Sequence, residues 1–175
     1  MRCLQATLIM TREIKSDYLK NISKVINSLG LRISSYDVER PWGGFFVIDE
    51  NQAQKFANIY FDGKNIQDLQ IAGKLSPKIL AIQPHSKLSW QYHHRRSETW
   101  RVIEGPVGII RSMSDEQTKV KILKKGDVIT LENKERHRLI GQKNWALVAE
   151  FWQHTDKKNP SNEEDIIRLD DNYQR

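Results

Sequence analysis

After Gly30, short segments rich in Val, Ile, Phe, Tyr and Trp recur along the chain, and turn-forming residues separate them. Many short apolar segments at nearly regular spacing are typical of an all-β sandwich or barrel. Turn signals stand between them, at Pro41-Trp42-Gly43-Gly44, Asp62-Gly63-Lys64-Asn65, Gly105-Pro106 and Lys125-Gly126-Asp127. The pattern predicts a mainly β fold with strands over residues 45–48, 58–61, 78–82, 107–110, 128–131 and 146–152. Residues 65–73 are compatible with a short helix inserted between strands.

The first thirty residues follow a different pattern. Between Thr11 and Leu29, apolar side chains recur at spacings of three and four residues, which is the period of one face of an α-helix. Gly30 stands where a helix commonly ends in the left-handed conformation. We therefore expect a helical appendage over residues 1–30 and a main domain over residues 31–175. The helix is expected to lie against that domain or to form a dimer contact.

Composition excludes several classes of protein. With 175 residues, 38% of them hydrophobic and 29% charged, the chain has the composition of one globular domain and not that of a disordered segment. Its apolar runs, such as residues 147–152, are far shorter than the roughly 20 residues of a membrane span, so no membrane partner is expected. The single cysteine, Cys3, fits a reducing cytoplasm and cannot build a thiolate zinc cluster.

The net charge of +6 comes from basic residues that are scattered among acidic ones. Nucleic-acid binding needs clustered Lys and Arg, and even the tightest run, His93-His94-Arg95-Arg96, is followed closely by Glu98. We therefore expect no nucleic-acid partner. A basic pocket for a small phosphorylated or acidic ligand explains the surplus charge equally well.

The most informative stretch is Leu88-Ser89-Trp90-Gln91-Tyr92-His93-His94-Arg95-Arg96-Ser97-Glu98-Thr99-Trp100. Because side chains alternate along a strand, Gln91 and His93 are expected on the same face. Glu98 reaches that face if the chain turns or bulges between them, and His137 follows in a later run of strand and turn. An amide, two imidazoles and a carboxylate form a mixed nitrogen and oxygen set that suits zinc, iron, manganese or nickel.

The alternative is that His93 and His94 are a surface pair or part of a basic patch. On a strand, His94 points away from the side of His93, so we do not expect it to bind a metal. The remaining histidines, His85 and His154, are expected in loops or at the surface.

Two spacings resemble known motifs. Gln91-x-His93-x4-Glu98-x6-Gly105 resembles the first cupin motif, with Gln where the commonest cupins have His, and Gly126-x5-Glu132-x4-His137 resembles the second. More closely, the stretch from Leu88 to His94, with Arg96, Glu98 and Trp100, resembles the cupin domain of type II mannose-6-phosphate isomerases. Three further pieces are similar to that family: Arg40-Pro41-Trp42-Gly43, His137-Arg138-Leu139 and the tail from Glu164 to Tyr173.

The resemblance covers roughly Glu39 to the C-terminus, and it implies a cupin fold: a double-stranded β-helix, or jelly-roll barrel, with an N-terminal helix ahead of it. The chain departs from the family at three places. Glu132 and Lys134 stand where the second motif usually has Pro and Gly, so a different turn is expected before His137. The segment over residues 49–73 is longer than usual, so the pocket rim is expected to differ. We also expect no nucleotidyltransferase domain of the kind often fused ahead of this cupin.

The activity that the resemblance implies is the interconversion of an aldose phosphate and a ketose phosphate, most simply mannose 6-phosphate and fructose 6-phosphate. A proton moves between C2 and C1 through an enediol, which needs a divalent metal, a base and cations for the phosphate. The metal is expected to be zinc, with manganese, iron or cobalt as alternatives. Its expected ligands are Gln91, His93, Glu98 and His137.

The expected base is Glu150, because an acid among apolar neighbours on a strand is costly unless it is used or paired. The alternative is that Glu150 faces solvent from an edge strand. We assign catalytic roles to Glu150, Lys78 and Arg138. Substrate-binding roles go to Arg96, Trp42 and Arg168, since guanidinium groups suit phosphate and an indole can stack on a sugar face.

Two other classes of function stay open. A cupin with the same ligands can be an iron-dependent dioxygenase or an epimerase that acts on another small acid or sugar. A sugar-binding or regulatory cupin with a structural metal or none is the third possibility. The resemblance also implies a homodimer, because cupins commonly pair through their sheets.

Overall fold

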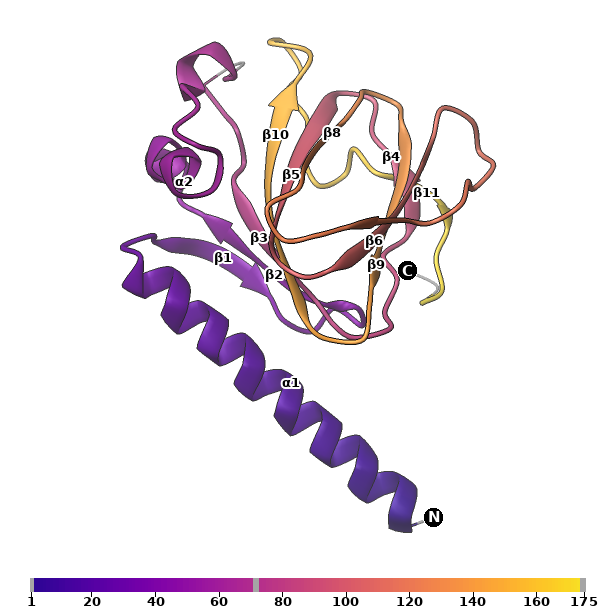
Figure 1. Ribbon diagram of the computed structural model, residues 1–175. Coiled ribbons are helices and arrows are strands. Elements are labelled where there is room, and N and C mark those ends of the chain that lie inside the picture. Colours follow the sequence, from indigo (N-terminus) through magenta and orange to yellow (C-terminus); the bar gives the residue numbers. More distant parts are fainter. Residues whose placement is uncertain (1, 71–72, 174–175) are drawn as a thin grey trace.

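Two antiparallel sheets form the body of the molecule, and the computed structural model describes residues 2–70 and 73–173, with side chains from residue 14 onward (Figure 1). The larger sheet has the strand order β1 (Ile33–Asp37), β2 (Gly43–Ile48), β3 (Lys78–Ile82), β10 (Ala146–His154), β5 (Arg96–Glu104) and β8 (Val128–Leu131). The smaller sheet has the order β11 (Ile167–Asp170), β4 (Trp90–Tyr92), β9 (Arg136–Gly141), β6 (Val107–Ser112) and β7 (Lys121–Leu123). The predicted mainly β class is confirmed.

The helix α1 (Arg2–Ser28) lies against the outer side of the larger sheet, beside β1 and β2 (Figure 1). Leu19, Ile22 and Ile26 are buried on its inner face at the predicted spacing of three and four residues. Gly30 follows the helix with a φ of 70°, so the predicted glycine end of the helix is confirmed. The helix begins at Arg2, ahead of the periodic pattern that starts at Thr11. No helix among the described residues is both long and apolar enough to cross a bilayer.

The predicted strand over residues 58–61 is wrong, because this segment belongs to α2 (Ala53–Tyr60) and the residue that follows it. A short apolar run does not distinguish a strand from a buried helix. Here Ala53, Phe56 and Ala57 are buried at helical spacing, and together they form the apolar face through which α2 packs. The expected helix over residues 65–73 is only a 3-10 turn, η2 (Ile66–Asp68), preceded by η1 (Glu50–Gln52) ahead of α2; residues 71–72 lie outside the described residues.

The interior of the barrel is filled by alternate residues of the strands in both sheets. Leu80 of β3, Val102 of β5 and Val148 of β10 belong to one buried apolar cluster between the sheets. The residues between them on the same strands face α1 and α2 and form a second cluster. Because side chains on a strand alternate, every second residue from Leu80, Val102 and Val148 also faces the barrel interior. This parity brings Lys78, Glu98 and Glu150 to one end of the barrel.

Candidate metal centre and pocket

Three side chains form a buried cluster at that end of the barrel. One ligand atom from each of His93, Glu98 and His137 lies within 4.8 Å of the other two. His93 Nε2 is 3.1 Å from Glu98 Oε1, and His137 Nε2 is 3.5 Å from Glu98 Oε2. The residues come from the end of β4, from β5 and from β9, so both sheets contribute to the cluster.

Backbone carbonyl groups orient the two imidazoles. His93 Nδ1 lies 2.5 Å from the carbonyl oxygen of Asp165, and His137 Nδ1 lies 2.9 Å from that of Glu135. A carbonyl oxygen only accepts hydrogen bonds, so each Nδ1 carries a proton, and Nε2 is the ring atom that faces the cluster. Burial lowers the pKa of His137 to about 4. That imidazole is therefore neutral at pH 7, as a metal ligand must be.

The cluster fits a divalent cation. Glu98 Oε2 and His137 Nε2 are buried and have no hydrogen-bond partner among the described residues. Buried polar atoms without partners are costly, and a cation between them would satisfy both. Burial opposes ionisation of Glu98, but His93 and Arg96 outweigh it and hold the pKa of Glu98 well below its usual value. Two imidazoles and an ionised carboxylate suit zinc, iron or manganese.

Gln91 lies beside this cluster. It pairs in register with His137 across β4 and β9, and its side chain lines the same pocket as Glu98. Its Oε1 accepts a hydrogen bond of 2.5 Å from Ser89 Oγ. A fourth ligand at this position stays a prediction.

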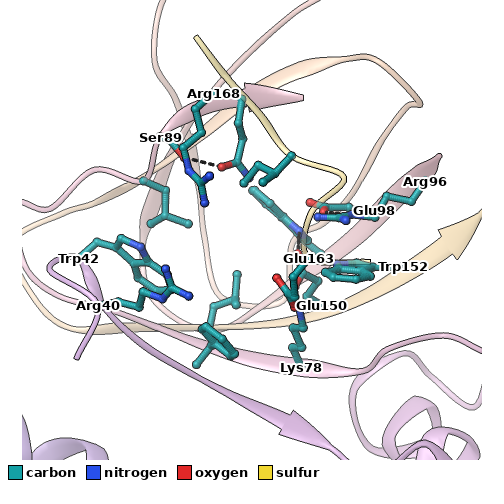
Figure 2. Close-up of a pocket in the computed structure, with 16 residues that line it drawn as sticks. Arg40, Trp42, Lys78, Ser89, Arg96, Glu98, Glu150, Trp152, Glu163 and Arg168 are labelled. Atoms are coloured by element: carbon teal, nitrogen blue, oxygen red, sulfur yellow. Dashed lines mark hydrogen bonds and ion pairs between the residues drawn. The ribbon is translucent and has the colours of Figure 1, made fainter. Parts of the chain in front are cut away.

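A pocket lies beside the cluster, and Glu98 is the cluster residue that lines it; its empty space, open solvent at the mouth included, is about 610 Å³. Figure 2 shows Glu98, Glu150 and Lys78 on one side of it, across from Trp42. Seven of the residues predicted from the sequence line this pocket: Trp42, Lys78, Gln91, Arg96, Glu98, Glu150 and Arg168. The structure therefore brings the candidate base, the candidate substrate contacts and two of the predicted ligands around one space.

Glu150 is buried in this pocket and does not face solvent from an edge. Its strand β10 lies between β3 and β5, which removes the edge-strand alternative. Trp100 Nε1 donates a hydrogen bond of 2.9 Å to Glu150 Oε1. Burial and the charge of Glu98 raise the pKa of Glu150 to about 8, against the opposing effect of Lys78 and Arg96. A carboxyl group with a pKa near neutrality can both take and return a proton.

Two cations lie on the ring of Trp152 in the same pocket. Lys78 Nζ is 3.7 Å and Arg96 Cζ is 3.6 Å from the ring centroid. Lys78 is buried, faces Glu150 across β3 and β10, and forms an ion pair with Glu163 of the C-terminal segment. Arg96 is bonded more completely: its Nε donates to Glu98 at 2.8 Å and its Nη1 to Ser161 at 2.9 Å. Of these two cations, Lys78 therefore makes fewer bonds to other side chains.

Arg138 does not line the pocket. As the neighbour of His137 on β9 it faces the opposite side of the sheet, where its Nη2 donates at 2.8 Å to the carbonyl oxygen of Asp170 and lies 2.9 Å from the Asp170 carboxylate. Arg138 therefore links β9 to β11 through Asp170.

We expect Arg138→Met to lower the free energy of unfolding by about 1–2 kcal/mol, because a buried charged hydrogen bond is lost. KM for a sugar phosphate is expected to stay unchanged. Urea unfolding and steady-state kinetics test this expectation together. A tenfold rise in KM at unchanged stability would instead return Arg138 to the substrate site.

The turn before His137 keeps a tight geometry although Glu132 and Lys134 replace the usual Pro and Gly. Lys134 has a φ of 62°, in the left-handed region that favours glycine. Its backbone N–H donates at 2.9 Å to the carbonyl oxygen of His93, and the Glu135 carboxylate accepts from the N–H of Glu132 at 2.8 Å. The turn therefore differs from the family motif in its residues. Lys134, which stands where the motif usually has Gly, adopts the left-handed backbone conformation.

We expect Lys134→Gly to raise the free energy of unfolding by up to about 1 kcal/mol. The substitution removes the roughly 1–2 kcal/mol cost of the left-handed conformation. This gain is partly offset, because glycine raises the conformational entropy of the unfolded chain, which costs roughly 0.5–1 kcal/mol. Lys134→Val is the matched control, and a β-branched residue there is expected to destabilise the protein. Equal stability of the two variants in urea would contradict this account of the turn.

The other histidines divide as follows. His85 and His94 are exposed, and the His94 ring packs against Tyr92 and takes no part in the cluster. The expectation for His154 is wrong: it is buried on β10, and its Nδ1 accepts a hydrogen bond of 3.0 Å from the N–H of Ser161. Strand parity gave a signal for this, because His154 has the same parity as Glu150 and Trp152.

Several pocket residues were not predicted from the sequence. Trp100 and Trp152 share the parity of Glu98 and Glu150 on their strands, so alternation could have identified them. Arg40 and Phe45 flank the Trp42 segment, and Phe45 packs against the core between the sheets. Glu163 belongs to the polar C-terminal segment, and no pattern marks it, whereas Ile166 lies in the tail from Glu164 to Tyr173 that resembles the family.

Comparison with known proteins places this geometry in a family. Residues 54–171 match the model of the family described as mannose-6-phosphate isomerase C-terminal. No curated protein matches the chain.

Several solved structures are similar to this chain at low identity. Vicilin from hazelnut, Corylus avellana, is 15% identical, with a TM-score of 0.53 over 78% of this chain and 35% of its own. A recombinant oxalate oxidase in complex with glycolate is 14% identical, with a TM-score of 0.51 over 76% of this chain and 58% of its own. A cupin-superfamily sugar phosphate isomerase from Silicibacter pomeroyi is 14% identical, with a TM-score of 0.40 over 46% of this chain and 50% of its own. The chain thus spans little more than half, or less, of each of these structures.

The family match covers the His-Glu-His cluster, the segment between β10 and β11 and every pocket residue except Arg40, Trp42 and Phe45. The structural matches extend the likeness to the barrel as a whole. The expected cupin fold is therefore confirmed, with a helix ahead of the barrel. The chain belongs to the mannose-6-phosphate isomerase C-terminal family of cupin domains.

Proposed function

We propose that the protein is a metal-dependent sugar-phosphate isomerase that interconverts mannose 6-phosphate and fructose 6-phosphate. The observation that carries the proposal is the position of Glu150, a buried carboxyl group with a raised pKa, in a pocket that Glu98 of the His-Glu-His cluster also lines. Aldose–ketose isomerisation needs these two parts together, because a proton leaves carbon while negative charge develops on oxygen. The family to which the chain belongs supports the choice of substrate.

His93, Glu98 and His137 would hold the metal, with Gln91 as the proposed fourth ligand. A bound divalent metal supplies Lewis-acid polarisation of the sugar oxygens at C1 and C2. Zinc suits this donor set, and manganese, iron and cobalt are the alternatives to be tested.

Glu150 is proposed to take the proton from C2 of mannose 6-phosphate and to return it to C1, which gives fructose 6-phosphate through the enediol. The hydrogen bond from Trp100 Nε1 holds the carboxyl group in place during both transfers. With a pKa of about 8, Glu150 is partly ionised at pH 7 and remains basic enough to accept a proton from carbon.

Lys78 is proposed to bind the phosphate, and Arg168 and Arg96 contribute positive charge to the same pocket. Trp42 offers an indole face at the rim for the sugar ring. A bound phosphate keeps C1 and C2 in register with Glu150. Such positioning of the reacting atoms lowers the barrier to proton transfer.

The test is a coupled assay of mannose 6-phosphate conversion with the full chain, before and after chelation, with zinc, manganese, iron and cobalt added back in turn. Activity that is lost on chelation and restored by one metal is the expected result. Bound metal without turnover of any hexose phosphate would overturn the proposal and leave the dioxygenase, epimerase or sugar-binding alternatives.

A further inference from the structure

The segment between β10 and β11 crosses from the larger sheet to the edge of the smaller one (Figure 1), and its residue Asp165 contacts His93 of the His-Glu-His cluster. Its residues are polar, yet Ser161 and Asp165 are buried. Ser161 is bonded to the end of β10 through the ring of His154, as described above. Polar residues that are buried in a connecting segment need specific partners, and Asp165 has an unusually complete set.

The carboxylate of Asp165 accepts three hydrogen bonds. Two come from the backbone N–H groups of His94 at 3.1 Å and Arg95 at 2.9 Å, and the third comes from Ser161 Oγ at 2.7 Å. The backbone carbonyl of the same residue accepts the Nδ1–H of His93 at 2.5 Å. One residue therefore fixes both the loop that follows His93 and the ring of His93 itself.

We propose that Asp165 is a positioning residue of the metal centre, which holds the His93 imidazole in the tautomer and orientation of a ligand. This inference rests on the metal centre of the proposed function. Groups that hydrogen-bond to the far nitrogen of a ligating imidazole fix its tautomer and orientation, and their loss typically lowers metal affinity about 10- to 100-fold. Here that bond is made by a main-chain carbonyl, and the side chain of Asp165 keeps the carbonyl in place.

The same segment also builds one wall of the substrate pocket. Glu163 precedes Asp165, Ile166 and Arg168 follow it, and all three line the pocket. Arg96 adds a second link, because its Nη1 also donates at 3.0 Å to the carbonyl oxygen of Asn162 while its Nε bonds to Glu98. Ordering of the wall and binding of metal are therefore coupled, and by linkage the coupling acts in both directions.

Cobalt(II) titration of the metal-free full chain tests the proposal, because the visible absorption of bound cobalt reports its ligand geometry without any sugar. Asp165→Asn keeps the shape of the side chain but turns one oxygen into an NH₂ group that faces N–H donors. We expect the dissociation constant for cobalt to rise about 10- to 100-fold, with an altered spectrum. Ser161→Ala, which removes one of the three donors and keeps the carboxylate, is expected to give a smaller rise.

Two controls separate positioning from stability. Glu164→Gln changes the exposed neighbour of Asp165, and Ile26→Ala weakens the core under α1, far from the cluster. Both are expected to bind cobalt with the wild-type constant and spectrum. In hydrogen exchange, cobalt is expected to protect the amides of residues 161–167 in the wild type but not in Asp165→Asn.

The outcomes distinguish this inference from the isomerase proposal. Wild-type cobalt binding in Asp165→Asn would overturn the role of Asp165 while the metal centre stands. If Asp165→Asn binds cobalt more weakly than the wild type, and the wild type turns over no sugar phosphate, the role of Asp165 is supported and the isomerase proposal is overturned. A wild type that binds no cobalt would overturn both.

Discussion

His137→Asn is expected to abolish metal binding and to lower kcat by roughly 10³-fold, because about 4 kcal/mol of transition-state stabilisation disappears with the metal. Asn is a sharp probe at this position. Its amide can still donate to the carbonyl oxygen of Glu135, as His137 Nδ1–H does, while the Nε2 ligand atom is absent. The loss of metal affinity is expected to exceed the roughly 100-fold effect of outer-shell changes, since a ligand itself is removed.

The metal-free variant is expected to stay folded. His137 Nε2 has no hydrogen-bond partner among the described residues, so its removal breaks no bond there. What is lost is the edge-on contact with Trp100, whose ring centroid is 5.4 Å away, and we expect a cost of no more than about 2 kcal/mol.

Thermal unfolding with and without added zinc measures the effect on binding. The wild type should rise in melting temperature with zinc and His137→Asn should not. His94→Asn is the matched control, because that imidazole is exposed and outside the cluster, and its zinc response should equal that of the wild type. A zinc-dependent rise in His137→Asn equal to that of the wild type would remove His137 from the ligand set.

Alternation along strands accounts for much of what the sequence predicts about the site. Glu98 and Glu150 lie on long strands and share the parity of the buried apolar residues Val102 and Val148, so a period of two residues puts both carboxylates in the barrel. The same rule argues against Arg138 as a pocket residue, because it follows His137 directly on β9. The family resemblance led us to expect Arg138 in the pocket. In the structure Arg138 faces the other side of the sheet, as strand alternation predicts.

The remaining features depend on contacts that leave no pattern in side-chain types. The bond from His93 is made to a main-chain carbonyl, which every residue has, so nothing in the sequence marks Asp165 for that role. Residues 58–61 show a second limit. Their apolar run suits a strand, and only the packing of α2 against the sheet decides for a helix.

Glu150→Gln is expected to lower kcat by about 10²- to 10⁴-fold, the usual contribution of a general base. Gln keeps the size of the side chain and an oxygen that can accept from Trp100 Nε1, so the pocket should keep its shape. Zinc affinity is expected to remain at the wild-type value, which separates this variant from His137→Asn. Loss of zinc binding in Glu150→Gln would instead make Glu150 part of the metal centre.

The pH dependence of stability gives an independent test, with a definite sign. The pKa of Glu150 is about 8 in the folded protein and 4.5 in the reference state, so between these values the folded state keeps a proton that the unfolded state has lost. The stability that this proton contributes is fully present below pH 4.5 and is lost as the pH rises through about 8. Activity runs the other way, because the base works in its ionised form, and wild-type kcat should rise over the same range.

Glu150→Gln cannot ionise, so it should lose less stability than the wild type between pH 5 and pH 8 in urea unfolding. Glu116→Gln, at an exposed position away from the pocket, is the control and should follow the wild type. Parallel curves for Glu150→Gln and the wild type would mean that Glu150 is already ionised in the folded protein at pH 5. The carboxylate would then have too low a pKa to take a proton from carbon, and the base would have to be sought elsewhere in the pocket.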